Sequence, residues 1–352
     1  MWPYWVMFFI PAMFAIYKPG FVTYQSRDFD KEQWIIFICL ALLIGFRFQV
    51  GGDWGNYLRR FNDNLGLSFF EVMQLGDPFY HLFNWISQIF DWGMIGTNVL
   101  CGVIFSFCLV KFCFAMPRPW LALLVSIPNI VIVMGMGYTR QGVALSLVML
   151  ALLSLTKGNV LKFLFWTLIA AAFHKSAVLM MPLAGFINTR YRLVALISAV
   201  VMAYLSYSVF LDKSVDDLVK NYIDAEYESQ GAFVRLLMNV LPAVIFIVWR
   251  KRFMMNKSTL SLWSFMALMS ILLMAILFVS PSSTAVDRVA LFMLPLQVAV
   301  FSYLPDIFGP RKRKILTAAT VFYYFIVLFV WLNFANFSIY WLPYQFYPFL
   351  YL

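Results

Sequence analysis

The sequence predicts an all-α polytopic membrane protein with about twelve transmembrane helices. Hydrophobic residues make up 63% of its 352 residues and charged residues only 12%, and the mean hydropathy is +0.82. Apolar runs of roughly 15 to 22 residues recur along the chain, close to the length that crosses a bilayer core of about 30 Å. These observations exclude a soluble globular protein. The net charge of +10 is assigned to membrane topology, and no nucleic-acid partner is expected.

The predicted spans follow from the apolar runs in chain order. The first has no basic segment before it and no cleavage site, so we expect a retained helix rather than a signal peptide. The spans cover residues 1–17, 33–48, 94–114, 119–136, 138–156, 160–173, 175–189, 192–210, 232–249, 259–280, 288–305 and 315–334. The two that flank His174 are short for a bilayer, which predicts tilting, kinking or an incomplete crossing there.

Two segments outside these spans are expected to lie along the membrane surface. Residues 66–93 include DPFYHLFNWISQIF, which is apolar on one face but too short and polar to cross, so an interfacial or re-entrant helix is predicted. Residues 211–231 are acidic overall and place apolar residues on one helical face, which predicts a short amphipathic outer loop helix, either a lid or a solvated connector. With the spans, they predict a single integral membrane domain over residues 1–352.

All four cysteines lie inside apolar runs, where a thiol behaves as a small hydrophobic side chain. Their spacing fits neither a disulfide framework nor a zinc site. We therefore expect no metal site and no cofactor.

The distribution of lysine and arginine predicts the orientation of the spans. When the N-terminus faces outward, most of the 26 basic residues fall on inner loops and helix ends, and most acidic residues fall outside. The run RKRK at residues 311–314 is the densest inner group. The positive-inside rule is therefore satisfied with both termini outside.

In this orientation, the polar residues next to apolar runs fall at the outer ends of their spans. An arginine that faces lipid costs several kcal/mol, so these side chains are expected to face the bundle interior or a hydrated cavity. A one-sided cavity is typical of an enzyme or receptor that works from outside, whereas a transporter more often carries polar groups at the midplane. The residues are Arg47, Asp53, Arg140, His174, Lys175, Asp287 and Arg288.

Each of these residues also has an ordinary structural explanation. Arg47 can extend to lipid headgroups from the end of its span, and Asp53, in GGDWGNY, is placed to cap a helix. A lone histidine such as His174, in FHKSA, is more often structural than catalytic. Arg288 can pair with its acidic neighbour. Arg140, in GYTRQG, is the strongest candidate for a ligand contact, because a guanidinium fork matches pyrophosphate oxygens.

Five short motifs follow one another along the chain. They are Arg47, Asp53 and Tyr57 at the spacing R-x5-D-x3-Y, then TRQGVA, FHKSA, DRVALFMLPLQ and the aromatic tail WLPYQFYPF. In this order they resemble the Wzy-type polysaccharide repeat-unit polymerases of the EpsG-like branch. The resemblance covers nearly the whole chain. It implies a multi-pass enzyme of the bacterial inner membrane, similar in fold to the GT-C membrane glycosyltransferases. Such an enzyme joins oligosaccharide repeats linked to undecaprenyl pyrophosphate at the outer, periplasmic face.

The chemistry that this resemblance implies gives each candidate residue a role. The growing glycan leaves undecaprenyl pyrophosphate and joins the non-reducing end sugar of a new repeat, so the reaction needs cations for the pyrophosphate and a base for the acceptor hydroxyl. Arg47, Arg140 and Arg288 are assigned to the pyrophosphate, Tyr57 and Lys175 to substrate binding, and His174 or Asp53 to the base. Because no acidic cluster of metal-binding spacing lies outside, metal-independent glycosyl transfer is expected.

Two other functions stay open. An O-antigen ligase or another GT-C glycosyltransferase would share the outer arginines but pass the glycan to a different acceptor. A lipid-linked oligosaccharide flippase or exporter is disfavoured by the one-sided polar residues. A polymerase of this kind is expected to work among membrane lipids with a chain-length regulator and a flippase as partners. Its aromatic tail would either line a glycan groove or form an interfacial belt.

Overall fold

The structure is a computed structural model that describes residues 1–18, 29–187, 193, 197, 231–280 and 283–350. The chain divides into two compact units. The first comprises Met1–Leu150, Ile169–Lys175 and Phe301–Leu352, and the second comprises Ala151–Leu168 and Ser176–Val300. The predicted span at 192–210 and the predicted loop helix at 211–231 lie almost wholly outside the described residues.

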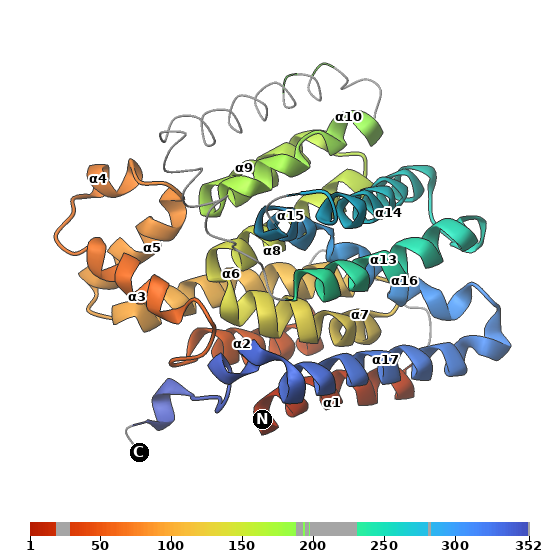
Figure 1. The fold of residues 1–352 in the computed structure, drawn as a ribbon, viewed down its shortest axis with the longest axis horizontal. Helices are drawn as coiled ribbons and strands as arrows, with labels where there is room; N and C mark the ends of the chain where they lie inside the picture. Colours follow the sequence, from red (N-terminus) through yellow and green to blue (C-terminus); the bar gives the residue numbers. More distant parts are fainter. Residues whose placement is uncertain (19–28, 188–192, 194–196, 198–230, 281–282, 351–352) are drawn as a thin grey trace. The chain divides into compact units, whose positions relative to one another are not determined.

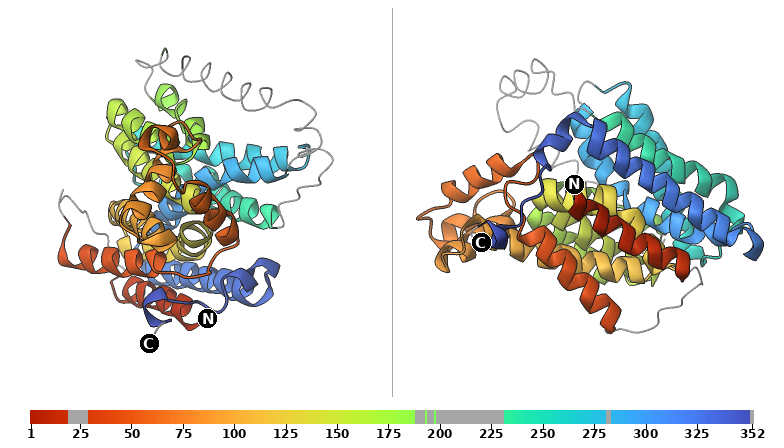
Figure 2. Two further views of the ribbon diagram at one scale, coloured as in Figure 1. Left: turned by 90° about the vertical axis from the view of Figure 1, so that its left-hand side faces the viewer. Right: turned by 90° about the horizontal axis from the view of Figure 1, so that it is seen from below.

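The first unit contains the helices from both ends of the chain (Figure 1). α1 and α17 lie side by side and both contact α7, while α2 packs along α6 (Figure 2). The helices are α1 (Trp2–Tyr17), α2 (Lys31–Gly45), α3 (Trp54–Asp63), α4 (Phe69–Met73), α5 (Pro78–Ile89), α6 (Gly93–Phe114), α7 (Pro119–Ser126), the π-helix η1 (Ile127–Gly135), most of α8 (Thr139–Thr156), the end of α9 (Val160–Phe173) and α17 (Arg313–Phe334). The short helices α3 to α5 follow α2 and precede α6.

The second unit contains polar contacts inside its helix packing. On α13, Arg235 donates to both carboxylate oxygens of Asp287, at 2.9 and 2.6 Å. One turn further along, Asn239 donates to Ala290 O and accepts from Gln297 Nε2 (2.6 Å). Asp287 therefore pairs with Arg235. The helices of this unit are η2 (Lys175–Met180), α10 (Leu183–Ile187), α13 (Ala232–Trp249), η5 (Arg250–Arg252), α14 (Lys257–Leu277), α15 (Ser283–Ala290), η6 (Leu291–Met293) and α16 (Pro295–Tyr303).

The predicted spans agree with observed helices over most of the described chain, and the exceptions have backbone causes. The span predicted at 119–136 changes from an α-helix to a π-helix at Ile127, next to Pro128, which has no N–H to donate. The span predicted at 288–305 is bent by 41° before Pro295. The span predicted at 175–189 is instead a 3-10 helix followed by the short α10.

Five helices among the described residues are long and apolar enough to cross a membrane, or six if the bent pair is one span. They are Gly93–Phe114, Thr139–Thr156, Ala232–Arg252, Lys257–Leu277 and Pro310–Phe334, with Ser283–Met293 and Pro295–Asp306 as the bent pair. The described residues form helices and loops, with a single isolated bridge between Arg47 and Phe346. This confirms the all-helical membrane class, while the twelve spans and the GT-C-like fold stay predictions.

Arg47, directly after α2, holds four segments of the first unit together. Only 1% of this residue is exposed. Its guanidinium donates to Met136 O (2.9 Å), Ile44 O (2.6 Å), Asn98 Oδ1 (3.1 Å) and Thr139 Oγ1 (2.6 Å). These acceptors belong to the end of α2, to α6, to the residue after η1 and to the start of α8. Because a buried cation without partners is very costly, this set of contacts strongly favours one arrangement of the four segments.

The aromatic tail after α17 folds back onto the segment around Arg47. Tyr347 N donates to Phe46 O (2.8 Å), and Phe48 N donates to Gln345 O (3.0 Å). Trp341 is 3% exposed, and its indole Nε1 donates to Ile132 O within η1 (2.9 Å). At Trp341 the tail is therefore part of the interior of the unit.

Two glycines allow this close packing. Gly51 has φ of +108°, and a Cβ there would lie 2.4 Å from Met136 O. A Cβ on Gly137 would lie 2.3 Å from the Trp341 ring. Larger residues at either position would push the tail or η1 away from Arg47.

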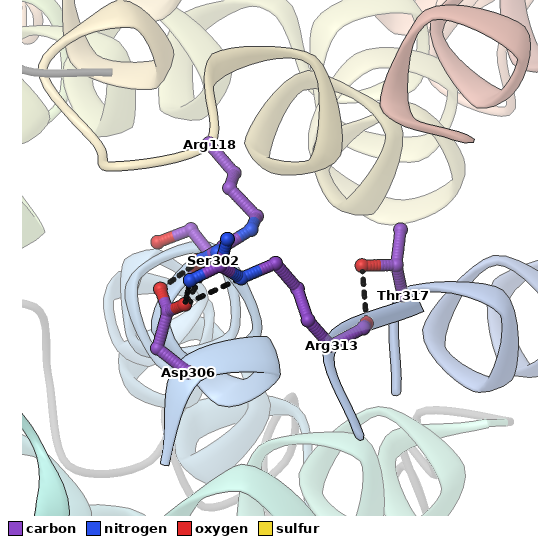
Figure 3. A network of polar contacts seen from close by, with 5 residues as sticks. All are labelled: Arg118, Ser302, Asp306, Arg313 and Thr317. Atoms are coloured by element: carbon purple, nitrogen blue, oxygen red, sulfur yellow. Dashed lines mark hydrogen bonds and ion pairs between the residues drawn. The ribbon is translucent and has the colours of Figure 1, made fainter. Parts of the chain in front are cut away.

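A second polar network lies at the other end of α6 and α17. Arg118 and Arg313 converge on Asp306 (Figure 3). Arg118 Nη2 donates to Asp306 Oδ1 (2.7 Å), its Nη1 pairs with Oδ2 and with Ser302 O (3.2 Å), and Arg313 Nε donates to Oδ1 (3.0 Å). The 22 residues of α6 rise about 33 Å. The first unit thus has polar networks at two ends, separated by apolar helices of about bilayer thickness.

Replacing Arg47 with lysine should lower the stability of the protein by at least about 2 kcal/mol, because one ammonium leaves several of the four acceptors unpaired. Thermal unfolding in detergent measures this. Arg59→Lys, on the exposed face of α3, is the matched control and should unfold like wild type. An Arg47→Lys protein of normal stability would show that these hydrogen bonds do not hold the unit together.

Candidate active site

Asp77, in the turn before α5, joins residues from distant parts of the first unit. Its Oδ2 accepts a hydrogen bond from Arg140 Nη1 at the start of α8 (2.6 Å), and its Oδ1 accepts one from the backbone N–H of Lys175 (3.3 Å). His174 Nδ1 lies 3.6 Å from Asp77 Oδ2, an ion-pair distance rather than a hydrogen bond. Asp77, Arg140 and His174 are called the Asp77 cluster below.

Aromatic packing brings the end of α9 to the beginning of α5. The Phe173 ring contacts Phe79 and Phe83, with ring centroids 5.6 and 5.3 Å apart. Phe79 and Phe83 are one turn apart, so they form one apolar face of α5. Because His174 follows Phe173 directly, this packing places the imidazole next to Asp77.

The guanidinium of Arg140 lies near two tyrosine rings. The guanidinium carbon lies 5.9 Å from the Tyr57 ring centre and 5.8 Å from that of Tyr80, within cation–π range. The Tyr57 hydroxyl accepts a hydrogen bond from the Arg140 backbone N–H (3.4 Å). Burial, and then the charge of Asp53, raise the pKa of Tyr57 to about 12 although Arg140 opposes them. The phenol is therefore protonated at neutral pH and able to donate to a ligand.

Asp77 is ionised at neutral pH. Burial by itself would raise the pKa of this carboxyl, but His174, Arg140 and the Lys175 N–H together outweigh burial and hold the pKa below its ordinary value of 3.8. Its side chain is only 6% exposed. The Asp77 cluster thus contains a buried carboxylate whose charge is stabilised by Arg140 and by the groups around it.

Two nitrogen atoms of the Asp77 cluster lack a hydrogen-bond partner within the part of the chain that the structure describes. They are Arg140 Nε and His174 Nδ1, and both atoms are buried. As whole side chains, Arg140 is 20% and His174 17% exposed. Buried polar atoms normally have partners, so two unpaired nitrogens in a partly open cluster make it a candidate site for an anionic or hydroxyl-bearing ligand.

The structure brings four of the predicted site residues together, namely Tyr57, Arg140, His174 and Lys175. Lys175 contributes its backbone N–H, while its side chain is exposed. Arg47 is linked to the cluster through Thr139, the neighbour of Arg140, but it is buried and already makes four hydrogen bonds. The site described here therefore does not use Arg47 as a ligand contact.

Two predicted residues lie outside the Asp77 cluster. Asp53 occupies the N-cap position of α3 without making a side-chain cap hydrogen bond, and it accepts instead from Asn56 Nδ2 (3.3 Å). It lies one turn before Tyr57. Arg288 is an exposed residue of α15 in the second unit, so the cluster is described without it.

Sequence reasoning missed Asp77, the residue at the centre of the cluster. It stands in the segment GDPFYH, for which the sequence predicts part of an interfacial or re-entrant helix. A signal was present: an acidic residue directly before a proline that begins a helix lies at the N-cap, where its carboxylate stays near other polar groups. Contact with Arg140, 63 positions away, is not visible in one sequence.

Comparison with known proteins agrees with the motifs. The model of the EpsG family matches residues 34–346. The chain belongs to the EpsG family. The match includes every residue of the Asp77 cluster, and EpsG membership indicates a membrane protein of the polysaccharide-polymerase type. No curated protein and no solved structure matches this EpsG-family chain. Among its described residues, no group of three or more His, Cys, Asp or Glu side chains is arranged to hold a metal ion.

The stabilising effect of Asp77 should depend on pH in a defined direction. Because its pKa is lower in the folded protein than the ordinary value of 3.8, its contribution is complete above that value and is lost as the pH falls through the folded-state pKa. Wild type should therefore be more stable than Asp77→Asn by about 3 kcal/mol near pH 7. Thermal unfolding from pH 7 downward should show this difference shrinking below about pH 4. A pH-independent difference would contradict an ionised Asp77.

Proposed function

We propose that this EpsG-family protein is a bacterial inner-membrane glycosyltransferase that polymerises oligosaccharide repeats linked to undecaprenyl pyrophosphate. The growing glycan is transferred from its lipid pyrophosphate to the non-reducing end sugar of a new lipid-linked repeat. The observation that carries the proposal is the Asp77 cluster, in which Arg140 and His174 lie together with unpaired nitrogens in a partly open position. An anionic leaving group and a hydroxyl nucleophile need these two kinds of side chain.

Arg140 is proposed to stabilise the pyrophosphate leaving group. A guanidinium presents its donors as a planar fork that matches two phosphate oxygens. One Nη of Arg140 is held by Asp77, whereas Nε has no partner among the described residues. As the sugar–oxygen bond breaks, negative charge grows on the pyrophosphate and the interaction with Arg140 strengthens. Tyr57, protonated at neutral pH, is suited to donate to a sugar or phosphate oxygen nearby.

His174 is proposed as the base that accepts the proton of the acceptor hydroxyl. An imidazole nitrogen is the side-chain group most often used for general base catalysis. Asp53 is the second candidate, and its place at the start of α3, one turn before Tyr57, keeps that assignment open. Arg288 remains a predicted pyrophosphate contact, and the exposed Lys175 side chain a predicted substrate contact. The buried Arg47 instead holds Thr139, the neighbour of Arg140.

The position of the cluster along the helices suits a lipid-linked substrate. The Asp77 cluster lies at the end of the first unit where α6 and α8 begin, and the Arg118–Asp306 network lies at the end where α6 stops. We propose that the first of these ends is the periplasmic one, with both termini outside. The pyrophosphate can then reach Arg140 while the polyprenyl chain stays in the hydrocarbon layer. A metal-independent reaction is proposed.

Purified protein supplied only with lipid-linked repeats should produce a ladder of longer products, which gel electrophoresis of the glycans detects. Arg140→Ala should lower the rate by about 10²- to 10³-fold, as expected for the loss of one donor to the developing charge. Arg59→Ala, on the exposed face of α3, is the control and should give the normal ladder. The absence of elongation by folded wild type would contradict the polymerase proposal. Transfer of the glycan to a different acceptor would indicate a ligase instead.

Substitution of each base candidate by an amide side chain distinguishes the two. If His174 is the base, His174→Gln should lower the elongation rate by about 10²-fold or more, while Asp53→Asn retains most of it. Initial rates at saturating substrate measure both variants. The opposite order would assign the base to Asp53, and two active variants would leave deprotonation to the substrate or solvent.

A further inference from the structure

Asp77 has an unusual backbone conformation for a residue with a side chain. Its φ is 62° and its ψ is 58°, the left-handed region, and Pro78 follows it. Residues with a side chain rarely adopt this region, although aspartate tolerates it better than most. A glycine would fit the turn without strain but would carry no carboxylate. The combination of a strained position and a charged side chain indicates that the carboxylate has a function at this place.

The contacts of that carboxylate are divided between its neighbours. Oδ2 holds Arg140 Nη1 at 2.6 Å and lies 3.6 Å from His174 Nδ1, while Oδ1 accepts from the Lys175 N–H. Asp77 thereby fixes one edge of the guanidinium and leaves the buried Nε unpaired. The same carboxylate fixes the backbone that carries His174.

We infer that Asp77 is a positioning residue that fixes Arg140 and His174 relative to each other, so that the Nε side of Arg140 faces the pyrophosphate of the donor. This inference rests on the proposed function, since it names how the same site is organised. Asp77 itself contacts no substrate in this arrangement. Its carboxylate sets the direction of the guanidinium and the distance between the cation and the base.

Asp77→Asn tests the inference, because asparagine tolerates the left-handed region but removes the charge. The matched control is Asp91→Asn, since Asp91 also has a positive φ, of 53°, but is exposed at the end of α5. Inorganic pyrophosphate should raise the Tm of wild type and of Asp91→Asn, and it should raise that of Asp77→Asn much less. In the elongation assay, Asp77→Asn should lose about 100-fold in kcat/KM, and Asp91→Asn should match wild type.

The outcomes separate this inference from the polymerase proposal. A pyrophosphate response without elongation by wild type would sink the polymerase and leave the role of Asp77 standing. An equal or larger pyrophosphate response in Asp77→Asn would show that Asp77 does not position Arg140, or competes for it, and would overturn the inference. So would the absence of any response in wild type.

Asp77→Glu covers the case in which the asparagine variant does not fold. This variant keeps the charge pair but moves the carboxylate by one methylene. The positioning role predicts a weakened pyrophosphate response here too, and an undiminished response would contradict it.

Discussion

The arrangement of the first unit depends on one buried cation, Arg47. Its guanidinium donates four hydrogen bonds to neutral acceptors on α2, on α6, after η1 and on α8. In an apolar interior these bonds cannot be exchanged for water, so displacing any of the four segments leaves a buried polar atom unpaired. One acceptor, Thr139, precedes Arg140. The hydrogen bonds of Arg47 that hold the helices together therefore also fix the backbone position of Arg140.

The arginines of this unit differ in how far their donors are already used. Arg47 is fully enclosed, and Arg118 is bound to Asp306 and Ser302 O, so both act within the fold. Arg140 is partly exposed, lies over two tyrosine rings and has a buried Nε without a partner among the described residues. A guanidinium that is held by a carboxylate on one edge and keeps an unpaired donor on another is suited to anion recognition. A candidate site arginine therefore differs from a structural one in having an N–H group without a protein partner, whereas both carry the same charge.

Much of the fold was predictable from the sequence, because the formation of each membrane helix depends on a contiguous stretch of apolar residues. An apolar run of bilayer length forms a helix wherever it stands, so α1, α6, α8, α13, α14 and α17 were predicted within a few residues. The sequence also singled out Arg140 and His174, because polar residues beside apolar runs need partners, whereas Tyr57 was singled out by the family resemblance. The partners of these residues were not predictable, because Asp77 meets Arg140 only through tertiary packing and Asp287 pairs with Arg235, 52 positions away. For Trp341 the sequence predicted a glycan groove or an interfacial belt, and its hydrogen bond to Ile132 O inside the unit was equally unpredictable.

A carboxylate at the centre of a proposed pyrophosphate site needs a physical explanation, because it repels the substrate. Without Asp77, the unpaired charge of Arg140 would have to be stabilised by the tyrosine faces alone, and its long side chain would sample several rotamers. Asp77 balances that charge in the absence of substrate and removes the rotamer freedom before binding, which lowers the entropic cost of recognition. The repulsion is confined because Asp77 is buried and uses its oxygens on Arg140 and Lys175. The ion pair with Asp77 neutralises part of the charge of Arg140 but fixes the orientation of its guanidinium. This suits a reaction whose rate depends on the alignment of groups more than on tight binding.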